Sequence, residues 1–305
     1  MKIGLISDLH LLSKTPESRC DNILTKQWDK LEYVLSYCKK NEIHHLLQAG
    51  DFFDIPRNWE TFDKTVTLLK KYPSVRIYLV EGQHDRYMRN DNTVTNLSLL
   101  HRLGLLTILK NSISFGQFVV HGISFEDNMN IDKAIDFVAA NEIHKDLYNI
   151  LVIHAPISDA PLFPGHEFSK ASLLLKKHKE FDLILCGDIH KAFVTRHGKT
   201  TIVNTGSMIR KEDNEYNQTH KPHFILADTG KSAIHYVDIP HEPYEKVFSQ
   251  QEEIIESDIL SDFVDAVQHP ISDEMDVYKR IERFITDNNI EPGVSQWIQE
   301  VSQNA

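Results

Sequence analysis

The sequence predicts an α/β fold in which two mixed β-sheets pack together between helices, a four-layer α-β-β-α sandwich with a small C-terminal helical segment. Two observations support this fold class. In the first part of the chain, apolar runs typical of strands alternate with segments of helical spacing, which favours parallel strands with crossovers. Later, β runs flank short turns such as His197-Gly198-Lys199. Two packed sheets accommodate both patterns.

The elements are expected in a regular order. Strands are predicted at residues 3–7, 46–49, 75–80, 150–153, 183–186, 193–196, 200–204, 224–227 and 233–239, with short β runs within 106–124. Helices are predicted around Trp28 to Cys38, Phe62 to Leu69, and residues 97–103, 131–138 and 170–179. Pro240 and Pro243 end the regular pattern, so we expect one domain over residues 1–245 and a helical segment over 246–305.

The composition is that of an ordinary soluble protein. Of the 305 residues 41% are apolar, and no run approaches the ~18 apolar residues of a membrane span. The N-terminus enters a strand without a signal-peptide pattern, so we expect a cytoplasmic protein without membrane contact. The three cysteines form no CxxC pair, which indicates neither a disulfide framework nor a zinc knuckle. The formal charge of -11 argues against a general nucleic-acid coat protein but allows a local basic groove.

Side chains that can bind metals follow the predicted strands where the strands end. At Gly50 the backbone can turn sharply and let an ion approach Asp51. Because layered α/β folds bind ligands beyond the carboxyl ends of their strands, distant residues are expected to meet there. The candidate ligands are Asp8, His10, Asp51, Gln83, His154, Asp188 and His190. Aspartate and histidine suit Mn, Fe, Zn or Mg, and a shared carboxylate can hold two ions ~3.5–4 Å apart that clamp a phosphate ester and ionise a water for in-line attack.

Five motifs occur in order along residues 1–240. They are Asp8-x-His10, Gly50-Asp51, Gly82-x-His84-Asp85, the strand-end His154 and Gly187-x-x-His190. Together they resemble the motifs of the calcineurin-like metallophosphoesterases. Within that superfamily the chain is most similar to the SbcD-type DNA-repair exonuclease subunits of bacteria or phages. The finer resemblance rests on the run Gly50-Asp51-Phe52-Phe53-Asp54, the run Asn204-Thr205-Gly206-Ser207, residues 239–243 and the C-terminal helical segment.

The resemblance implies a role for each motif residue. The first metal ion would be bound by Asp8, His10 and His190. The second would be bound by Gln83, His154 and Asp188, with Asp51 bridging the two ions. His84 would protonate or hydrogen-bond the leaving oxygen, while Asp85 would fix the tautomer and orientation of His84.

Two residues depart from the family pattern. Gln83 stands where the family usually has Asn, and Asp188 stands where it usually has His. A third carboxylate in the ligand set favours a hard ion such as Mn over Zn. Two other interpretations of Asp188 stay open: it hydrogen-bonds a water, or it is a turn residue that caps backbone N–H groups.

The resemblance implies a DNA phosphodiesterase, a 3′ to 5′ exonuclease with endonuclease capacity, that uses two divalent ions, with Mn expected first and Mg, Fe or Zn as alternatives. Its implied partners are DNA and an SbcC-like SMC-family ATPase, and a homodimer is left open. Basic side chains that could contact DNA are Arg57, Arg86, Arg89, Lys191, Arg196, Arg210 and Lys211. The alternatives are a phosphatase of the same superfamily, acting on small molecules or proteins, and a binding subunit whose second metal site has lost its chemistry.

Overall fold

The computed structural model describes residues 1–89, 93–162 and 165–248. The chain divides into two units, Met1–Ser249 and Gln250–Ala305, and the second unit lies outside the described residues. The predicted helices of the segment 246–305 therefore lie outside the described residues as well. None of the described helices is long and apolar enough to cross a membrane.

The first sheet has six strands and contains the N-terminus. Its order is β14 (Ala233–Asp238), β13 (His223–Asp228), β1 (Lys2–Ile6), β2 (His45–Gln48), β3 (Arg76–Leu79) and β4 (Thr107–Ile108). Strands β1 to β4 are parallel, whereas β13 and β14 are antiparallel to their neighbours. The hairpin of β13 and β14 thus extends a parallel sheet, which makes the sheet mixed.

The second sheet also has six strands. Its order is β11 (Phe193–His197), β12 (Thr200–Asn204), β10 (Leu183–Gly187), β7 (Tyr148–His154), β6 (Phe118–Ile123) and β5 (Ile113–Ser114). The four inner strands are parallel and the two edge strands are antiparallel. The sequence prediction did not include the two-stranded sheet of β8 (Ile157–Ser158) and β9 (Ser169–Lys170).

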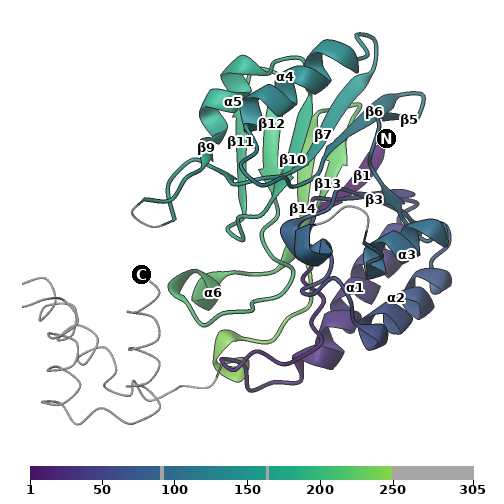
Figure 1. Ribbon diagram of the computed structural model, residues 1–305, viewed down its shortest axis with the longest axis vertical. Helices are drawn as coiled ribbons and strands as arrows, with labels where there is room; N and C mark the ends of the chain where they lie inside the picture. Colours follow the sequence, from purple (N-terminus) through teal and green to yellow (C-terminus); the bar gives the residue numbers. More distant parts are fainter. Residues whose placement is uncertain (90–92, 163–164, 249–305) are drawn as a thin grey trace, which may run out of the picture. The chain divides into compact units, whose positions relative to one another are not determined.

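Helices cover the outer face of each sheet (Figure 1). The first sheet carries α1 (Ile23–Lys40), α2 (Trp59–Lys71) and α3 (Asn96–Arg102). The second carries α4 (Ile131–Asn141) and α5 (Ala171–Lys177), the latter shorter than the predicted 170–179. A short helix that the sequence did not indicate, α6 (Glu215–Thr219), precedes β13, and 3-10 turns occur at Gln83–Asp85, Tyr87–Arg89 and Tyr244–Lys246.

Alternating side chains build three apolar layers. In β7, Ile150 and Val152 face the first sheet, while Leu151 and Ile153 pack with α4 and α5. On the other side, Leu46 of β2 packs among the residues of α1 and α2. Because successive residues of a strand point to opposite faces, each inner strand contributes to two layers at once. The predicted sandwich of two mixed sheets flanked by helices is confirmed.

Candidate functional site

The candidate ligands lie at the carboxyl ends of five parallel strands from the two sheets. In the first sheet β1 is followed by Asp8 and His10, β2 by Asp51 and β3 by Gln83, while in the second sheet His154 ends β7 and Asp188 and His190 follow β10. Two contacts join the strand ends across the sheets: Ser7 forms a bridge with Ser207, and the Nδ1 atom of His154 lies 2.6 Å from the Ala49 carbonyl oxygen. The two sheets therefore present one common edge.

The backbone at this edge is strained. The φ angles are 43° at Asp8, 43° at His10, 52° at Asp51 and 91° at Asp188, all in the left-handed region that side-chain-bearing residues avoid. Such residues cost of order 1–3 kcal/mol each and concentrate at functional sites. Gly82 permits the close approach, because a Cβ there would lie 2.1 Å from Asp51 Oδ1. The fold thus holds these side chains in positions that relaxed turns would not give.

One group of ligands consists of Asp8, His10 and His190. Their ligand atoms lie within 4.8 Å of one another, and the Nε2 atoms of the two imidazoles are 2.9 Å apart. Asp8 Oδ1 accepts a hydrogen bond from the Asp188 backbone N–H at 3.0 Å, whereas Asp8 Oδ2 is buried and no described residue forms a hydrogen bond with it. A buried carboxylate beside two imidazole nitrogens fits a divalent ion.

A second group consists of Gln83, His154 and Asp188. Gln83 Oε1 lies 2.7 Å from His154 Nε2, and the Gln83 amide donates to Asp188 Oδ1 at 2.8 Å. The distance from His154 Nε2 to Asp188 Oδ1 is 3.8 Å. The Asp188 carboxylate therefore faces Gln83 and His154. The Gln83 side chain, which is longer than that of the Asn usual in the family, reaches both His154 and Asp188.

Asp51 lies between the two groups. Its Oδ2 atom is buried and lies 3.5 Å from His10 Nε2 and 3.5 Å from His154 Nε2. It has no hydrogen-bond partner in the described part of the chain. Its Oδ1 atom accepts the backbone N–H of His84 at 2.9 Å. One oxygen thus fixes the orientation of the carboxylate, and the other faces a histidine of each group.

The electrostatics of the site fit metal ions. Burial, together with the neighbouring Asp51 carboxylate, raises the pKa of Asp8 well above its ordinary value. Burial and the adjacent His10 lower the pKa of His190 to about 3, which keeps this imidazole neutral at physiological pH. Neutral imidazole is the form that binds metals, and cations would relieve the crowding of buried carboxylates. The donor set suits two divalent ions and does not by itself select one metal.

His84 is half-buried and borders the first group. Its ring centroid is 5.0 Å from that of His10, and it shares a potential ligand cluster with His10 and Asp51. The expectation that Asp85 orients His84 is wrong, because Asp85 accepts the backbone N–H groups of Phe52, Phe53 and Gly82. His84 Nδ1 lies instead 2.8 Å from the carbonyl oxygen of Asp54. Asp85 therefore fixes the loop after β2, and burial beside Asp51 raises its pKa to about 7.

Asp54 is a site residue to which the sequence assigned no role. Its carboxylate lies 3.5 Å from His10 Nδ1 and 2.5 Å from Lys211 Nζ. Burial opposes its ionisation, but the hydrogen bonds of His10 and Lys211 outweigh burial and lower its pKa to about 2. A carboxylate that holds the far nitrogen of a metal-binding histidine fixes the ring and its tautomer. In the sequence, a role for Asp54 was indicated only by its place at the end of the run Gly50-Asp51-Phe52-Phe53-Asp54.

The basic residues expected to contact DNA have different surroundings. Arg57 stacks over the Tyr87 ring at 4.0 Å, and Arg86 donates to the Phe125 carbonyl. Lys191 and Arg196 are exposed, whereas the Arg89 side chain lies outside the description. For Arg210 the expectation is wrong: it is 3% exposed and lines a different cavity from the ligands.

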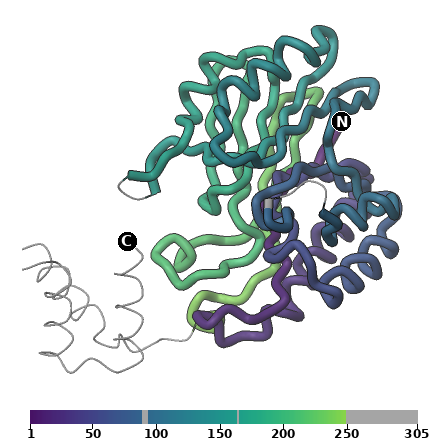
Figure 2. Tube along the Cα trace, viewed as in Figure 1, coloured from purple at the N-terminus to yellow at the C-terminus, as the bar shows by residue number. Residues whose placement is uncertain are grey.

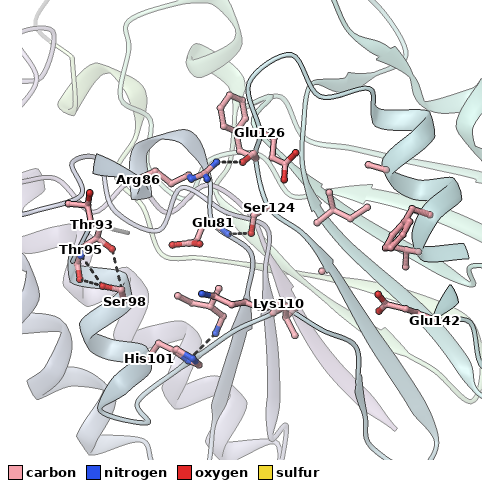
Figure 3. A pocket seen from close by; sticks show the side chains of 18 of the residues that line it. Glu81, Arg86, Thr93, Thr95, Ser98, His101, Lys110, Ser124, Glu126 and Glu142 are labelled. Carbon is pink, nitrogen blue, oxygen red and sulfur yellow. Dashed lines mark hydrogen bonds between the residues drawn. The ribbon is translucent and has the colours of Figure 1, made fainter. Parts of the chain in front are cut away.

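Two cavities border this region. One, of about 440 Å³, is lined by Asp188, His190, Lys191, Lys211 and Tyr216 among others, so it opens directly onto the ligands. The other, of about 670 Å³, contains none of the candidate ligands. Figure 3 shows Arg86, His101 and Lys110 around it together with Glu81, Glu126 and Glu142. The first cavity is therefore the one suited to a substrate.

Comparisons with known proteins found several similar chains and one matching family. A solved structure from Thermus thermophilus has a TM-score of 0.49 and 12% identity, covering 78% of this chain and 99% of that one. A dimetal phosphatase from Danio rerio has a TM-score of 0.49 and 14% identity, covering 74% and 92%. An uncharacterized protein of Acanthamoeba polyphaga mimivirus is 27% identical over 184 residues, 55% of this chain but only 13% of that longer protein. A family model described as calcineurin-like phosphoesterase matches residues 1–192, more than half of the sequence, so the chain belongs to this family of phosphoester hydrolases.

Proposed function

We propose that the protein is a DNA phosphodiesterase that uses two divalent ions, an SbcD-like exonuclease with endonuclease capacity in recombination and repair. The observation that carries the two-ion proposal is the position of Asp51 Oδ2, buried, unpartnered and 3.5 Å from a histidine of each ligand group. One carboxylate oxygen between two donor sets is the arrangement expected of a bridging ligand.

The residues of the two groups would hold the ions in separate places. Asp8, His10 and His190 would bind the first ion, and Gln83, His154 and Asp188 would bind the second, with Asp51 shared. Bound ions would supply Lewis-acid stabilisation of the phosphate and a nucleophilic water at neutral pH. The protein contributes a rigid edge, since strained backbone and the Asp54 and Asp85 carboxylates fix the ligands.

His84 is proposed to assist the leaving group. The Asp54 carbonyl oxygen 2.8 Å from Nδ1 selects the form with a proton on that nitrogen, so a second proton would be carried by Nε2. Such an imidazolium can give that proton to the leaving oxygen of a DNA strand. The basic side chains of Lys191 and Lys211 on the 440 Å³ cavity would contact the phosphates beside the scissile one.

One set of assays tests the proposal. Purified protein with Mn, Mg or Zn is incubated with plasmid DNA, linear DNA, and mono- and bis-p-nitrophenyl phosphate. We expect cleavage of DNA and of the diester. Hydrolysis of the monoester alone, with DNA left intact, would overturn the nuclease proposal in favour of a phosphatase.

The proposed partner is an SbcC-like ATPase, which the C-terminal segment would contact through its amphipathic helices. The motifs that resemble SbcD-type subunits support this partner. Co-purification of the two proteins with and without residues 250–305 tests it, and equal binding by both forms would contradict a role for the segment.

A further inference from the structure

Three basic side chains are buried together away from the candidate ligands. Arg19 and Lys30 are each 7% exposed, and Arg210 is 3% exposed. They line a cavity of about 320 Å³, at the lower end of the ~300–1,000 Å³ range of ligand pockets. Figure 2 shows where this region lies, with the purple loop after β1 beside the yellow-green end of the described chain, which Cys20 and Val247 connect through a 2.9 Å hydrogen bond. We call Arg19, Lys30 and Arg210 the cation cluster.

Fewer buried carboxylates than buried cations line the described part of this cavity. Asp21, with a 5% exposed side chain, lies 2.8 Å from Arg19 Nη2. The other acidic residues of the cavity are Glu242, which is 42% exposed and pairs with Lys26, and Asp29 on the surface. Among the described residues that line the cavity, three buried cations therefore accompany one buried carboxylate. An unpaired buried charge is costly.

Apart from the contacts of Arg19 with Asp21, their hydrogen bonds go to backbone carbonyls and leave donors available. Lys30 Nζ donates to the Met208 carbonyl at 3.1 Å, and Arg210 Nη2 donates to the Glu242 carbonyl at 2.5 Å. Arg210 Nε is buried without a hydrogen-bond partner among the described residues. A buried guanidinium N–H that lacks an acceptor and lines a cavity is a donor for a ligand.

Mutual repulsion of the charges in the cation cluster also indicates that the cavity takes a ligand of negative charge. Burial first, and then the neighbouring Arg19 and Arg210, lower the pKa of Lys30 to about 7. Burial and Arg19 also lower the pKa of Arg210. An anion in the cavity would remove both penalties, since it supplies the negative charge and the acceptors that the cluster lacks.

We propose that the cavity lined by Arg19, Lys30 and Arg210 binds a phosphate group, at a site separate from the two metal-ligand groups. Arg210 supplies Nε–H, Lys30 supplies a compact positive charge, and Arg19 holds the Arg210 carbonyl in place. The group belongs either to free inorganic phosphate or to a nucleotide or nucleic-acid end.

This site would act on the metal centre through one segment. Met208 accepts the Lys30 hydrogen bond through its carbonyl, and its N–H donates to the Asp8 carbonyl at 3.2 Å. Lys211, one residue after Arg210, contacts Asp54. A phosphate group bound to the cation cluster would therefore steady residues 207–211, which contact both Asp8 and Asp54.

The test separates the two sites by mutation. Binding of inorganic phosphate is measured by calorimetry and by thermal unfolding. The two proteins compared are the wild type with Mn and the variant Asp51→Asn, which is intended to prevent phosphate binding at the metal centre. Arg210→Gln and Lys30→Met are then added to Asp51→Asn, with the exposed Lys64→Gln as a control of equal charge change. We expect saturable binding in Asp51→Asn and in the Lys64→Gln control, and at least ~10-fold weaker binding in the two cluster variants, because each loses a charge-assisted hydrogen bond.

Further arms identify the source of the phosphate group. A nucleoside 5′-monophosphate and an oligonucleotide with or without a 5′-phosphate replace inorganic phosphate, at constant ionic strength. Tighter binding of the 5′-phosphorylated oligonucleotide supports a nucleic-acid end, and equal binding of all phosphates supports the free anion. Absence of saturable binding, or equal binding by Lys30→Met and Lys64→Gln, overturns the proposal and makes the cluster structural. Removal of a repelling charge in Lys30→Met is expected to raise the melting temperature of the phosphate-free protein. Weaker phosphate binding by this variant would then not be due to misfolding.

Discussion

The metal-ligand groups and the cation cluster are two buried charged regions of opposite sign, and residues 207–211 contact both. At the first, four residues have strained φ angles, and two carboxylate oxygens, Asp8 Oδ2 and Asp51 Oδ2, have no hydrogen-bond partner among the residues that the structure describes. At the second, no residue of the cluster has a positive φ, and the charged groups contact backbone carbonyls. The difference teaches that backbone strain accompanies side chains aimed at a common point, whereas excess charge alone can be buried with relaxed backbone.

The largest effect is expected at the negative region from a change that keeps all of its carboxylates. His84→Ala should slow DNA cleavage by ~10²–10⁴ while the metals stay bound, because the leaving oxygen loses its proton donor. Cleavage of bis-p-nitrophenyl phosphate should fall much less, since its leaving group needs no proton. The control is His101→Ala, which changes a histidine of the 670 Å³ cavity. Equal losses on both substrates would remove His84 from this role.

The next effect comes from removing one negative charge. Asp188→Ala should weaken the second ion by more than the ~10–100-fold typical of residues that only support a ligand, while the first ion stays bound. Asp188→His should keep activity and shift the metal preference from Mn toward Zn or Co. Titrations of Mn by calorimetry and by rate check both variants. If Asp188→Ala titrates like the wild type, the Asp188 carboxylate does not bind metal, and water completes the second site.

A smaller effect is expected from the positive region, as a dependence of stability on pH. The pKa of Lys30 is about 7 in the folded protein against an ordinary value of 10.5. Between these values the unfolded chain binds more protons than the folded one, so stability rises with pH by at most ~1.4 kcal/mol per unit. The titratable groups near Lys30 are Arg19, Arg210, Asp21, Lys26 and His220.

Urea unfolding of the wild type, Lys30→Met and Lys64→Gln from pH 6 to 9.5 checks this expectation. The part of the rise that Lys30 causes should disappear in Lys30→Met and persist in Lys64→Gln. A wild type and Lys30→Met that change in parallel would show that Lys30 does not lose its proton in this range.

The smallest effect is expected from deletion of residues 250–305. Val247 and Phe248 are buried against the described domain at 1% and 2% exposure, so the chain should be cut after them. We expect intrinsic manganese-dependent hydrolysis and stability close to those of the full chain, since both charged regions lie before residue 249. Rates and melting temperatures of the two forms give the answer. Unfolding or inactivity of the shorter form would make the segment structural and defeat the partner proposal.

The sequence by itself determined the fold class and the positions of the metal-ligand side chains. Alternating periodicities predicted the two sheets, since strand and helix spacing follow from local geometry. Strand-end residues such as Asp51 and His154 could be predicted to converge, because parallel strands deliver their carboxyl ends to one edge. The motifs were also enough to place the chain in its family.

Only the tertiary structure decided which groups orient these side chains and where excess charge is buried. The backbone carbonyl of Asp54, and not the Asp85 carboxylate, lies beside Nδ1 of His84. The two residues belong to different loops, and their spacing in the sequence did not predict this contact. Arg210, which the sequence suggested as a contact for DNA, is buried in the same cavity as Lys30. The His84–Asp54 contact spans 30 positions and the Lys30–Met208 contact spans 178. Local patterns carry no information about such partners, because packing brings them together.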